Sequence, residues 1–121
     1  MLDRTVPPPS VQSTDFDLIQ PDKKKLPNGV DLFFIHGGLQ EVLKIELLFK
    51  AGKWEEAVPG ASYFAAHLLS KGTRNKSSFD IAQLFDRYGA HLEVSAGMDV
   101  VSVSLYALSK NLKPVLDLLT E

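Results

Sequence analysis

The stretch from residue 43 to residue 73, "LKIELLFKAGKWEEAVPGASYFAAHLLSKGT", changes its pattern of apolar residues along its length. Residues 43–50 largely alternate apolar and polar side chains, which is typical of a strand with one buried face. From Ala61 onward the apolar residues recur every three or four positions, which is typical of an amphipathic helix. The stretch therefore predicts a strand that is followed, after a short connection, by a helix.

The predicted helix has two unlike faces, and Gly72 is expected to end it as a C-cap. One face is apolar and is expected to pack on the core of the domain. Its residues are Ala61, Phe64, Ala65, Leu68 and Leu69. The opposite face is expected to point into a cavity shared with a partner, and not into the domain's own core. Its residues are Tyr63, Ala66, His67 and Ser70.

The residues on either side of this stretch extend the pattern into a whole domain. Asn28-Gly29 predicts a tight turn before a strand that ends at Gly37-Gly38, and the short separation from the strand of residues 43–50 predicts an antiparallel pair. Beyond the helix, the periodicity predicts a helix over residues 78–88, two strands and a final helix that begins near Ser109. The order strand, strand, helix, helix, strand, strand, helix predicts an α+β fold, with an antiparallel or mixed sheet and helices packed on one face.

The first 25 residues differ from the rest of the chain. Pro7-Pro8-Pro9 favours an extended polyproline conformation, and the charged run of residues 22–25 is typical of a solvated lead-in. We therefore expect residues 1–25 to form an extended N-terminal arm and residues 26–121 to form the domain. Because the final helical pattern reaches Glu121 without a stop signal, we expect a truncated domain that belongs to a longer protein.

The composition is that of an ordinary globular domain, with 121 residues, 45% apolar residues and a net charge of -2. This charge provides no basic field for nucleic acid, and no segment approaches the ~20 apolar residues that a membrane span needs. The absence of cysteine excludes disulfides and cysteine-ligated zinc. The N-terminus lacks the apolar region of a signal peptide, and cytoplasmic and periplasmic locations both fit the sequence.

Three segments together resemble the N-terminal domain of the pitrilysin/insulinase family of zinc metallopeptidases. They are "LPNGVDLFFI", the stretch quoted above and "FDIAQLFDRYGAHLEVSAGMDVVSVSLYALSKNL", so the resemblance covers residues 26–121. In that family the first helix carries an inverted zinc motif, which is His, two residues, Glu and His, followed by a hydrophobic pair and Lys-Gly-Thr. Lys71-Gly72-Thr73 matches the end of this pattern. The family's third zinc ligand is a glutamate on a later helix, which would lie beyond Glu121.

Aligned on this tail, the zinc motif is degenerate. The first histidine falls on Tyr63, the general-base glutamate falls on Ala66, and only the second histidine is kept, as His67. A phenol with a pKa of ~10 is a poor zinc ligand, and alanine cannot take a proton from zinc-bound water. Catalytic zinc needs three protein ligands, so we expect no catalytic residue, no zinc and no peptidase activity in this chain.

The histidines also have simpler interpretations. His67 is expected to be a half-exposed helix residue with a local hydrogen bond. An unrelated zinc site formed by His36, His67 and His91 is the disfavoured alternative, because these residues lie on separate predicted elements without ligand spacing.

The resemblance implies a catalytically silent homologue that forms the structural and peptide-binding half of a peptidase chamber. A zinc-bearing homologous subunit or domain would complete the chamber, and Tyr63, His67 and Ser70 would face the peptide or the partner. Two alternatives remain open at this point: an active zinc endopeptidase whose ligands come from outside this chain, and a free-standing binding module. We also expect the 121-residue chain to self-associate through an unpaired sheet edge or its last helix.

Overall fold

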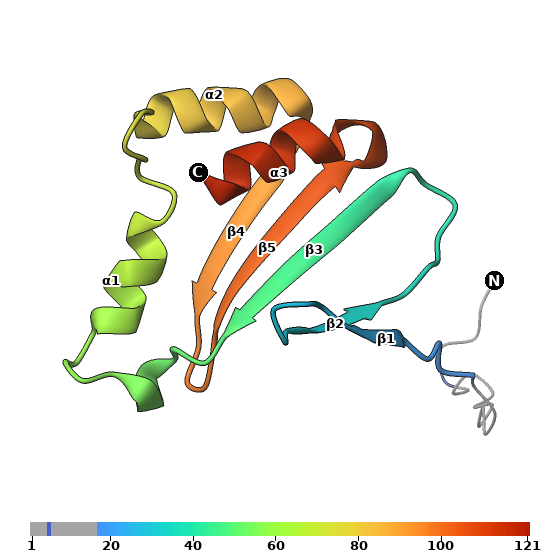
Figure 1. The fold of residues 1–121 in the computed structure, drawn as a ribbon, viewed down its shortest axis with the longest axis horizontal. Helices are drawn as coiled ribbons and strands as arrows, with labels where there is room; N and C mark the ends of the chain where they lie inside the picture. The colour runs from blue at the N-terminus through green and yellow to red at the C-terminus, as the bar shows by residue number, and fades with distance from the viewer. Residues whose placement is uncertain (1–4, 6–16) are drawn as a thin grey trace. The chain divides into compact units, whose positions relative to one another are not determined.

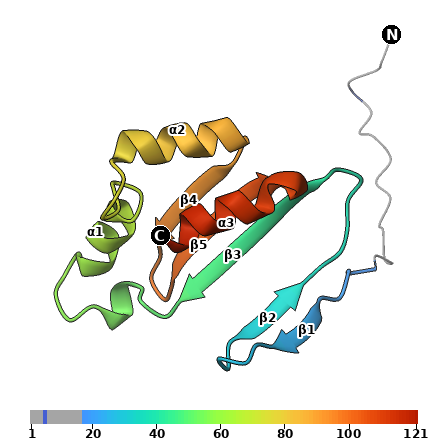
Figure 2. The ribbon, with the colours of Figure 1, turned by 45° about the horizontal axis from the view of Figure 1, so that its top comes forward.

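A computed structural model describes Thr5 and residues 17–121. The chain divides into two compact units, Met1–Leu39 and Gln40–Glu121. The first unit contains a β-hairpin, in which β1 (Asp22–Lys25) pairs antiparallel with β2 (Asp31–Phe34), as Figure 2 shows. The predicted turn at Asn28-Gly29 connects the two strands, and Gly29 has the positive φ of 87° that favours glycine.

Residues 22–25 are exposed, as predicted for a solvated run, but they form the paired strand β1 and not an extended lead-in. The ammonium group of Lys23 lies 5.0 Å from the ring centroid of Phe33, its direct partner across the hairpin. The ammonium group of Lys24 lies 5.2 Å from the ring centroid of Phe34, which is its diagonal neighbour on β2. Such contacts, and an ion pair of 3.0 Å from Lys23 to Asp31, let charged residues occupy a strand. The polyproline segment Pro7-Pro8-Pro9 of the predicted arm lies outside the described residues.

The second unit contains a three-stranded antiparallel sheet in the order β3-β5-β4. Its strands are β3 (Val42–Phe49), β4 (His91–Ala96) and β5 (Val101–Leu108). The predicted pairing of the first two sequence strands is wrong, because β2 pairs with β1 and β3 pairs with β5. The tight turn before β2 joins that strand to the residues that precede it, whereas β5 matches β3 along all eight residues.

Two helices cover one face of this sheet (Figure 1). They are α2 (Ser78–Tyr88) and α3 (Leu112–Thr120), which follows a short 3-10 turn, η2 (Ser109–Asn111). Both helices contribute to one core with the central strand, and its buried members are Ile81, Phe85, Leu105, Ala107 and Val115. Because Leu105 and Ala107 lie on the same side of β5, the two helices pack on the same face of the sheet.

The boundaries of α2 agree with the sequence prediction. Its first turn is closed by a capping box, in which the Asp80 N–H donates to Ser77 Oγ at 3.2 Å and the Ser77 N–H donates to Asp80 Oδ2 at 3.0 Å. Gly89 ends it in the left-handed conformation, with φ 59°. The predicted α+β class is confirmed. None of the helices in the described part of the chain has the length and hydropathy needed to cross a membrane.

Candidate functional site around helix α1

Helix α1 (Ala61–Leu68) lies alongside the edge strand β4, as Figure 1 shows. It follows a short 3-10 turn, η1 (Lys53–Glu55). The helix is shorter than predicted, because its C-cap is Leu69 and not Gly72. Gly72 instead forms an isolated antiparallel bridge with Ser77, so this glycine belongs to the connection between α1 and α2.

The face of α1 that packs against the domain is not the predicted one. Ser62 and Ala66 are its buried residues, and Ala66 is only 2% exposed, whereas Leu68 is 63% exposed. Ala66 was expected to point away from the core and Leu68 into it, so this assignment is wrong. The two buried side chains of the helix are small, and its large apolar residues stay exposed.

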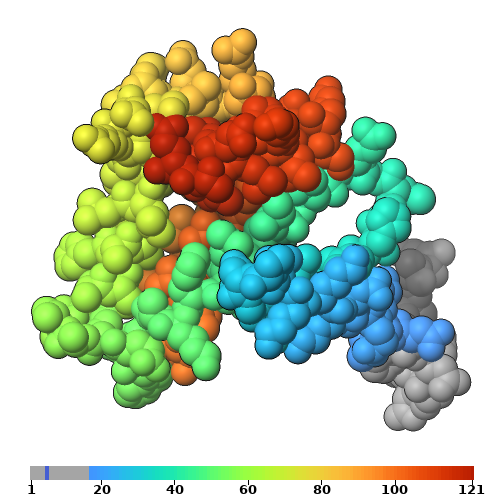
Figure 3. Space-filling view, in the orientation of Figure 1, coloured from blue at the N-terminus to red at the C-terminus, as the bar shows by residue number. Residues whose placement is uncertain are grey.

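Leu68 and Leu69, at the end of α1, face a hollow in the second unit, visible in Figure 3 between α1 and α3. Its volume is about 440 Å³, and its walls come from α1, the sheet, α2 and α3. Among the lining residues are Ala65, Leu68, Leu69, Phe49, Val94 and Leu119. The apolar face that the sequence assigned to the core therefore lines an open hollow in this chain.

Tyr63 and His67 lie together on the exposed side of α1. Their ring centroids are 4.1 Å apart with an angle of 32° between the planes, and Tyr63 is 54% exposed. His67 Nδ1 lies 3.2 Å from the Tyr63 carbonyl oxygen, so it donates to that oxygen when it carries the proton. Phe64 adds an edge contact to the Tyr63 ring at 5.6 Å. This local hydrogen bond agrees with the simple interpretation of His67.

Of the predicted site residues, Tyr63 and His67 lie together and are exposed. Ala66 is buried, and Ser70 is half-buried. Among the described residues, no cluster of three or more His, Cys, Asp or Glu side chains could hold a metal ion. Within that part of the chain, His36, His67 and His91 therefore form no such cluster. The residues at the α1 positions do not fit a catalytic zinc site, which needs three ligands and an open position for water.

Sequence reasoning missed one residue of this region, Glu56. Its carboxylate accepts hydrogen bonds from the Gly60 N–H at 2.8 Å, from the Ser62 N–H at 3.1 Å and from the Ser62 hydroxyl. The Ser62 hydroxyl, then the Gly60 N–H and, more weakly, the charge of Lys53 hold the pKa of Glu56 below its usual range. The sequence does contain a signal for this role of Glu56, because a carboxylate shortly before the start of a helix stabilises the helix N-terminus.

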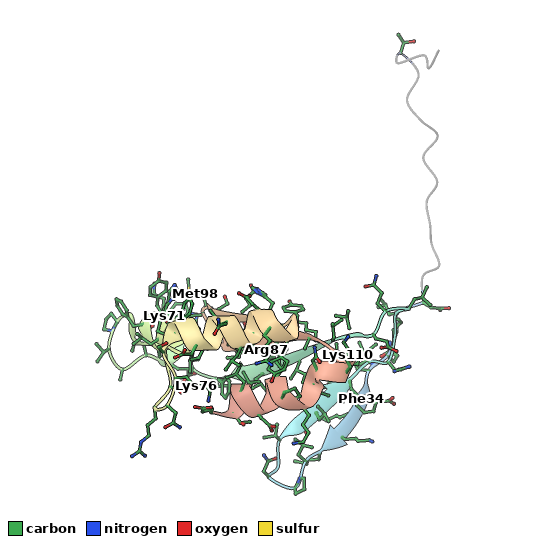
Figure 4. All side chains as sticks on the ribbon, turned by 90° about the horizontal axis from the view of Figure 1, so that it is seen from above. Phe34, Lys71, Lys76, Arg87, Met98 and Lys110 are labelled. Atoms are coloured by element: carbon green, nitrogen blue, oxygen red, sulfur yellow. The ribbon has the colours of Figure 1, made fainter. Side chains whose placement is uncertain are left out.

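The segment before Glu56 is bound to the turn between β4 and β5. The Lys53 N–H donates to the Gly97 carbonyl at 3.1 Å, and the Trp54 N–H donates to the Met98 carbonyl at 3.0 Å. A Cβ on Gly52 would lie 2.4 Å from the Met98 carbonyl oxygen, so only glycine permits this approach. Met98 is labelled in Figure 4.

The connection after α1 is bound to the end of helix α3. Lys76, labelled in Figure 4, forms an ion pair with Glu121 at the end of α3, and the Thr73 hydroxyl donates to the same carboxylate at 3.0 Å. Both contacts hold the pKa of Glu121 below its usual range, with the Lys76 hydrogen bond the larger cause. The segment that matches the family's Lys-Gly-Thr tail is thus anchored on the last helix.

Comparisons with known proteins agree with this architecture. Residues 39–121 match the family profile of insulinase, peptidase family M16. An uncharacterized zinc protease of Rickettsia felis is 28% identical over 99 residues, which cover 80% of this chain and 24% of that protein. Subunit 1 of the mitochondrial cytochrome b-c1 complex of Rattus norvegicus is 36% identical over 62 residues, which cover 51% of this chain and 13% of that protein.

Solved structures give the same result. A peptidase M16 inactive domain from Pseudomonas fluorescens superposes with a TM-score of 0.79 and 26% identity, over 84% of this chain and 26% of that one. A protease from Helicobacter pylori shares the fold, with a TM-score of 0.72 and 24% identity, over 86% of this chain and 25% of that one. The chain thus spans about a quarter of the length of the zinc protease and of the two solved structures, and 13% of the length of subunit 1. Since the family profile matches well over half of its residues, the chain belongs to the insulinase family, peptidase family M16.

Proposed function

We propose that this chain is a catalytically silent member of the family, which supplies a structural and peptide-binding wall of a chamber completed by a zinc-bearing homologous subunit or domain. The observation that carries the proposal is the set of side chains on α1. Where the family's motif has two zinc ligands and a general base, this helix has Tyr63, His67 and Ala66.

The burial of Ala66 supports the silent role. A general base must reach the water that it activates, and this position is 2% exposed and has no group that accepts a proton. Tyr63 and His67 are stacked on each other, and His67 Nδ1 contacts a backbone carbonyl. A solved relative described as an inactive domain is consistent with this interpretation.

Two features support peptide binding. In the described part of the chain, β4 is an edge strand, with β5 on one side. An edge strand offers backbone N–H and C=O groups to an extended peptide, and neighbouring pockets can take its side chains. Next to β4, α1 exposes the rings of Tyr63 and Phe64 and borders the apolar hollow. This combination suits an extended peptide with apolar side chains.

Zinc binding is the direct test of catalytic silence. After dialysis against metal-free buffer and exposure to one equivalent of zinc, we expect metal analysis to find far less than one zinc per chain. The reason is that Tyr63 and His67 provide at most one good ligand. A family member with an intact motif, treated in the same way, is the control. One zinc per chain that is lost in His67→Ala would contradict the proposal and favour an active endopeptidase.

Peptide binding is tested by the anisotropy of a fluorescein-labelled extended peptide with alternating apolar residues. Tyr63→Ala is expected to weaken binding by about tenfold, because exposed aromatic side chains are frequent anchors of interfaces. Phe79→Ala is the matched control, since Phe79 is also an exposed aromatic residue but lies on α2 and not on α1. Equal effects of the two substitutions would remove α1 from the proposed peptide site.

A further inference from the structure

We propose that Glu56 is the positioning residue of α1, and that it holds this helix beside the edge strand β4 by joining the helix N-terminus to the β4–β5 turn. The importance of this position for peptide binding rests on the proposed function. The positioning itself does not, because it concerns only the contacts between α1, η1 and the sheet.

The first step is the contact between Glu56 and the helix. The N-cap residue Gly60 has a φ of 89° and no side chain, so it cannot cap the helix itself. The Glu56 carboxylate takes this role, because it accepts from the Gly60 N–H and from both the N–H and the hydroxyl of Ser62. One side chain thus satisfies donors of the first turn that the helix leaves free.

The second step is the contact between η1 and the sheet. The backbone of Lys53 and Trp54 is hydrogen-bonded to the turn that joins β4 and β5, and the glycine before them lies against the same turn. Glu56 directly follows η1, and its own N–H donates to the Lys53 carbonyl at 3.4 Å. The carboxylate therefore connects α1 to a segment that is already fixed on the sheet.

The third step is the weakness of the remaining anchors. The buried residues of α1 are the small side chains Ser62 and Ala66, while Phe64, Leu68 and Leu69 are more than half exposed. Small side chains bury little apolar area, so they contribute little to holding the helix. The polar contacts of Glu56 consequently set the position of the helix N-terminus.

The charge of Glu56 makes this contact dependent on pH. Its pKa lies below the ordinary value of 4.5, so the contact is complete above that pH and is lost as the pH falls through the lower pKa of the folded state. The hydroxyl and N–H of Ser62 and the N–H of Gly60 face the carboxylate from the helix side, and the charge of Lys53 acts on it from η1.

Amide hydrogen exchange of the intact chain tests the proposal without any peptide. In Glu56→Ala, protection of the Gly60 and Ser62 amides is expected to fall by about tenfold or more, while protection of the Leu105 amide in β5 stays unchanged. Glu56→Gln should restore part of the protection, because its amide oxygen still accepts. Glu55→Gln is the matched control, since it removes the same charge from the neighbouring exposed residue.

The pH dependence provides a second readout that a merely structural role would not change. After correction for intrinsic rates, the protection of the Gly60 and Ser62 amides in the wild type should exceed that in Glu56→Gln at pH 7. The two should converge as the pH falls through the lowered pKa of Glu56. Equal protection in Glu56→Ala and Glu55→Gln, or a difference that persists at low pH, would overturn the proposal. If Glu56→Ala does not fold, the wild-type pH series against Glu56→Gln decides alone. If the amides behave as expected but the chain binds no peptide, the proposed function is wrong and the positioning role of Glu56 stands.

Discussion

Leu105→Ala is expected to lower the free energy of unfolding by about 2–5 kcal/mol, which is the range for truncating a fully buried leucine. Leu105 is 0% exposed and lies on the central strand β5, opposite Ile45 on one side and Leu92 on the other. The helices cover it with Phe85 and Val115. Because the sheet and both helices meet at this side chain, the cavity that alanine leaves cannot be filled by a small movement of one element.

Leu48→Ala is the matched control for this substitution. Leu48 lies on β3 of the same sheet but is 63% exposed, so its truncation should change the stability by less than about 0.5 kcal/mol. Urea unfolding of the two variants and the wild type measures both effects, and an unchanged slope would show that the unfolded state is comparable. Equal losses would mean that Leu105 does not occupy the centre of the core.

Ala66→Glu, which restores the family's general-base residue, is expected to destabilise the domain and not to produce a peptidase. A glutamate at this 2% exposed position adds volume, at a cost of about 1–3 kcal/mol, and loses hydration of its carboxyl group, at a further cost of about 1–3 kcal/mol. The helix would have to move away from β4 to expose the new side chain.

Ala65→Glu provides the comparison, because it places the same side chain one position earlier on the exposed part of the same helix. The loss of unfolding free energy in Ala65→Glu should be smaller by several kcal/mol in the same experiment. The reason is that an exposed glutamate neither crowds the core nor loses the hydration of its carboxyl group. Metal analysis of Ala66→Glu should still find no stoichiometric zinc, since Tyr63 occupies the place of the first ligand. Similar stabilities of the two variants would show that Ala66 is not packed against the strand.

Much of the fold could be predicted from local patterns. The Ser77 cap, the terminating Gly89 and the apolar stripe between them fix α2, because capping and periodicity act within a few residues. The strands of residues 91–96 and 101–108 were equally clear, since their alternation matches a sheet with one buried face. The alignment of Tyr63, Ala66 and His67 with the zinc motif stays a prediction from the sequence and its resemblance to the family.

The partners of β2 and β3 could not be predicted in the same way. Strand pairing depends on which strand edges come together in the folded chain. A short connection between two consecutive strands favours their pairing but does not require it. The neighbour of β2 is the charged strand β1, whose lysines are stabilised by aromatic rings across the hairpin. This contact exists only once the turn has brought the two strands together.

The sequence by itself determined the family and the α+β class. Only the tertiary structure decided which face of α1 is buried, and it reversed the expectation from hydrophobicity. The physical reason is that helix periodicity identifies an apolar face, whereas the elements around the helix decide which face is covered. Here Ser62 and Ala66 are covered, while Leu68 borders the open hollow. The role of Glu56 was decided at the same level, because its partners become neighbours only when the loop before α1 folds back on the helix.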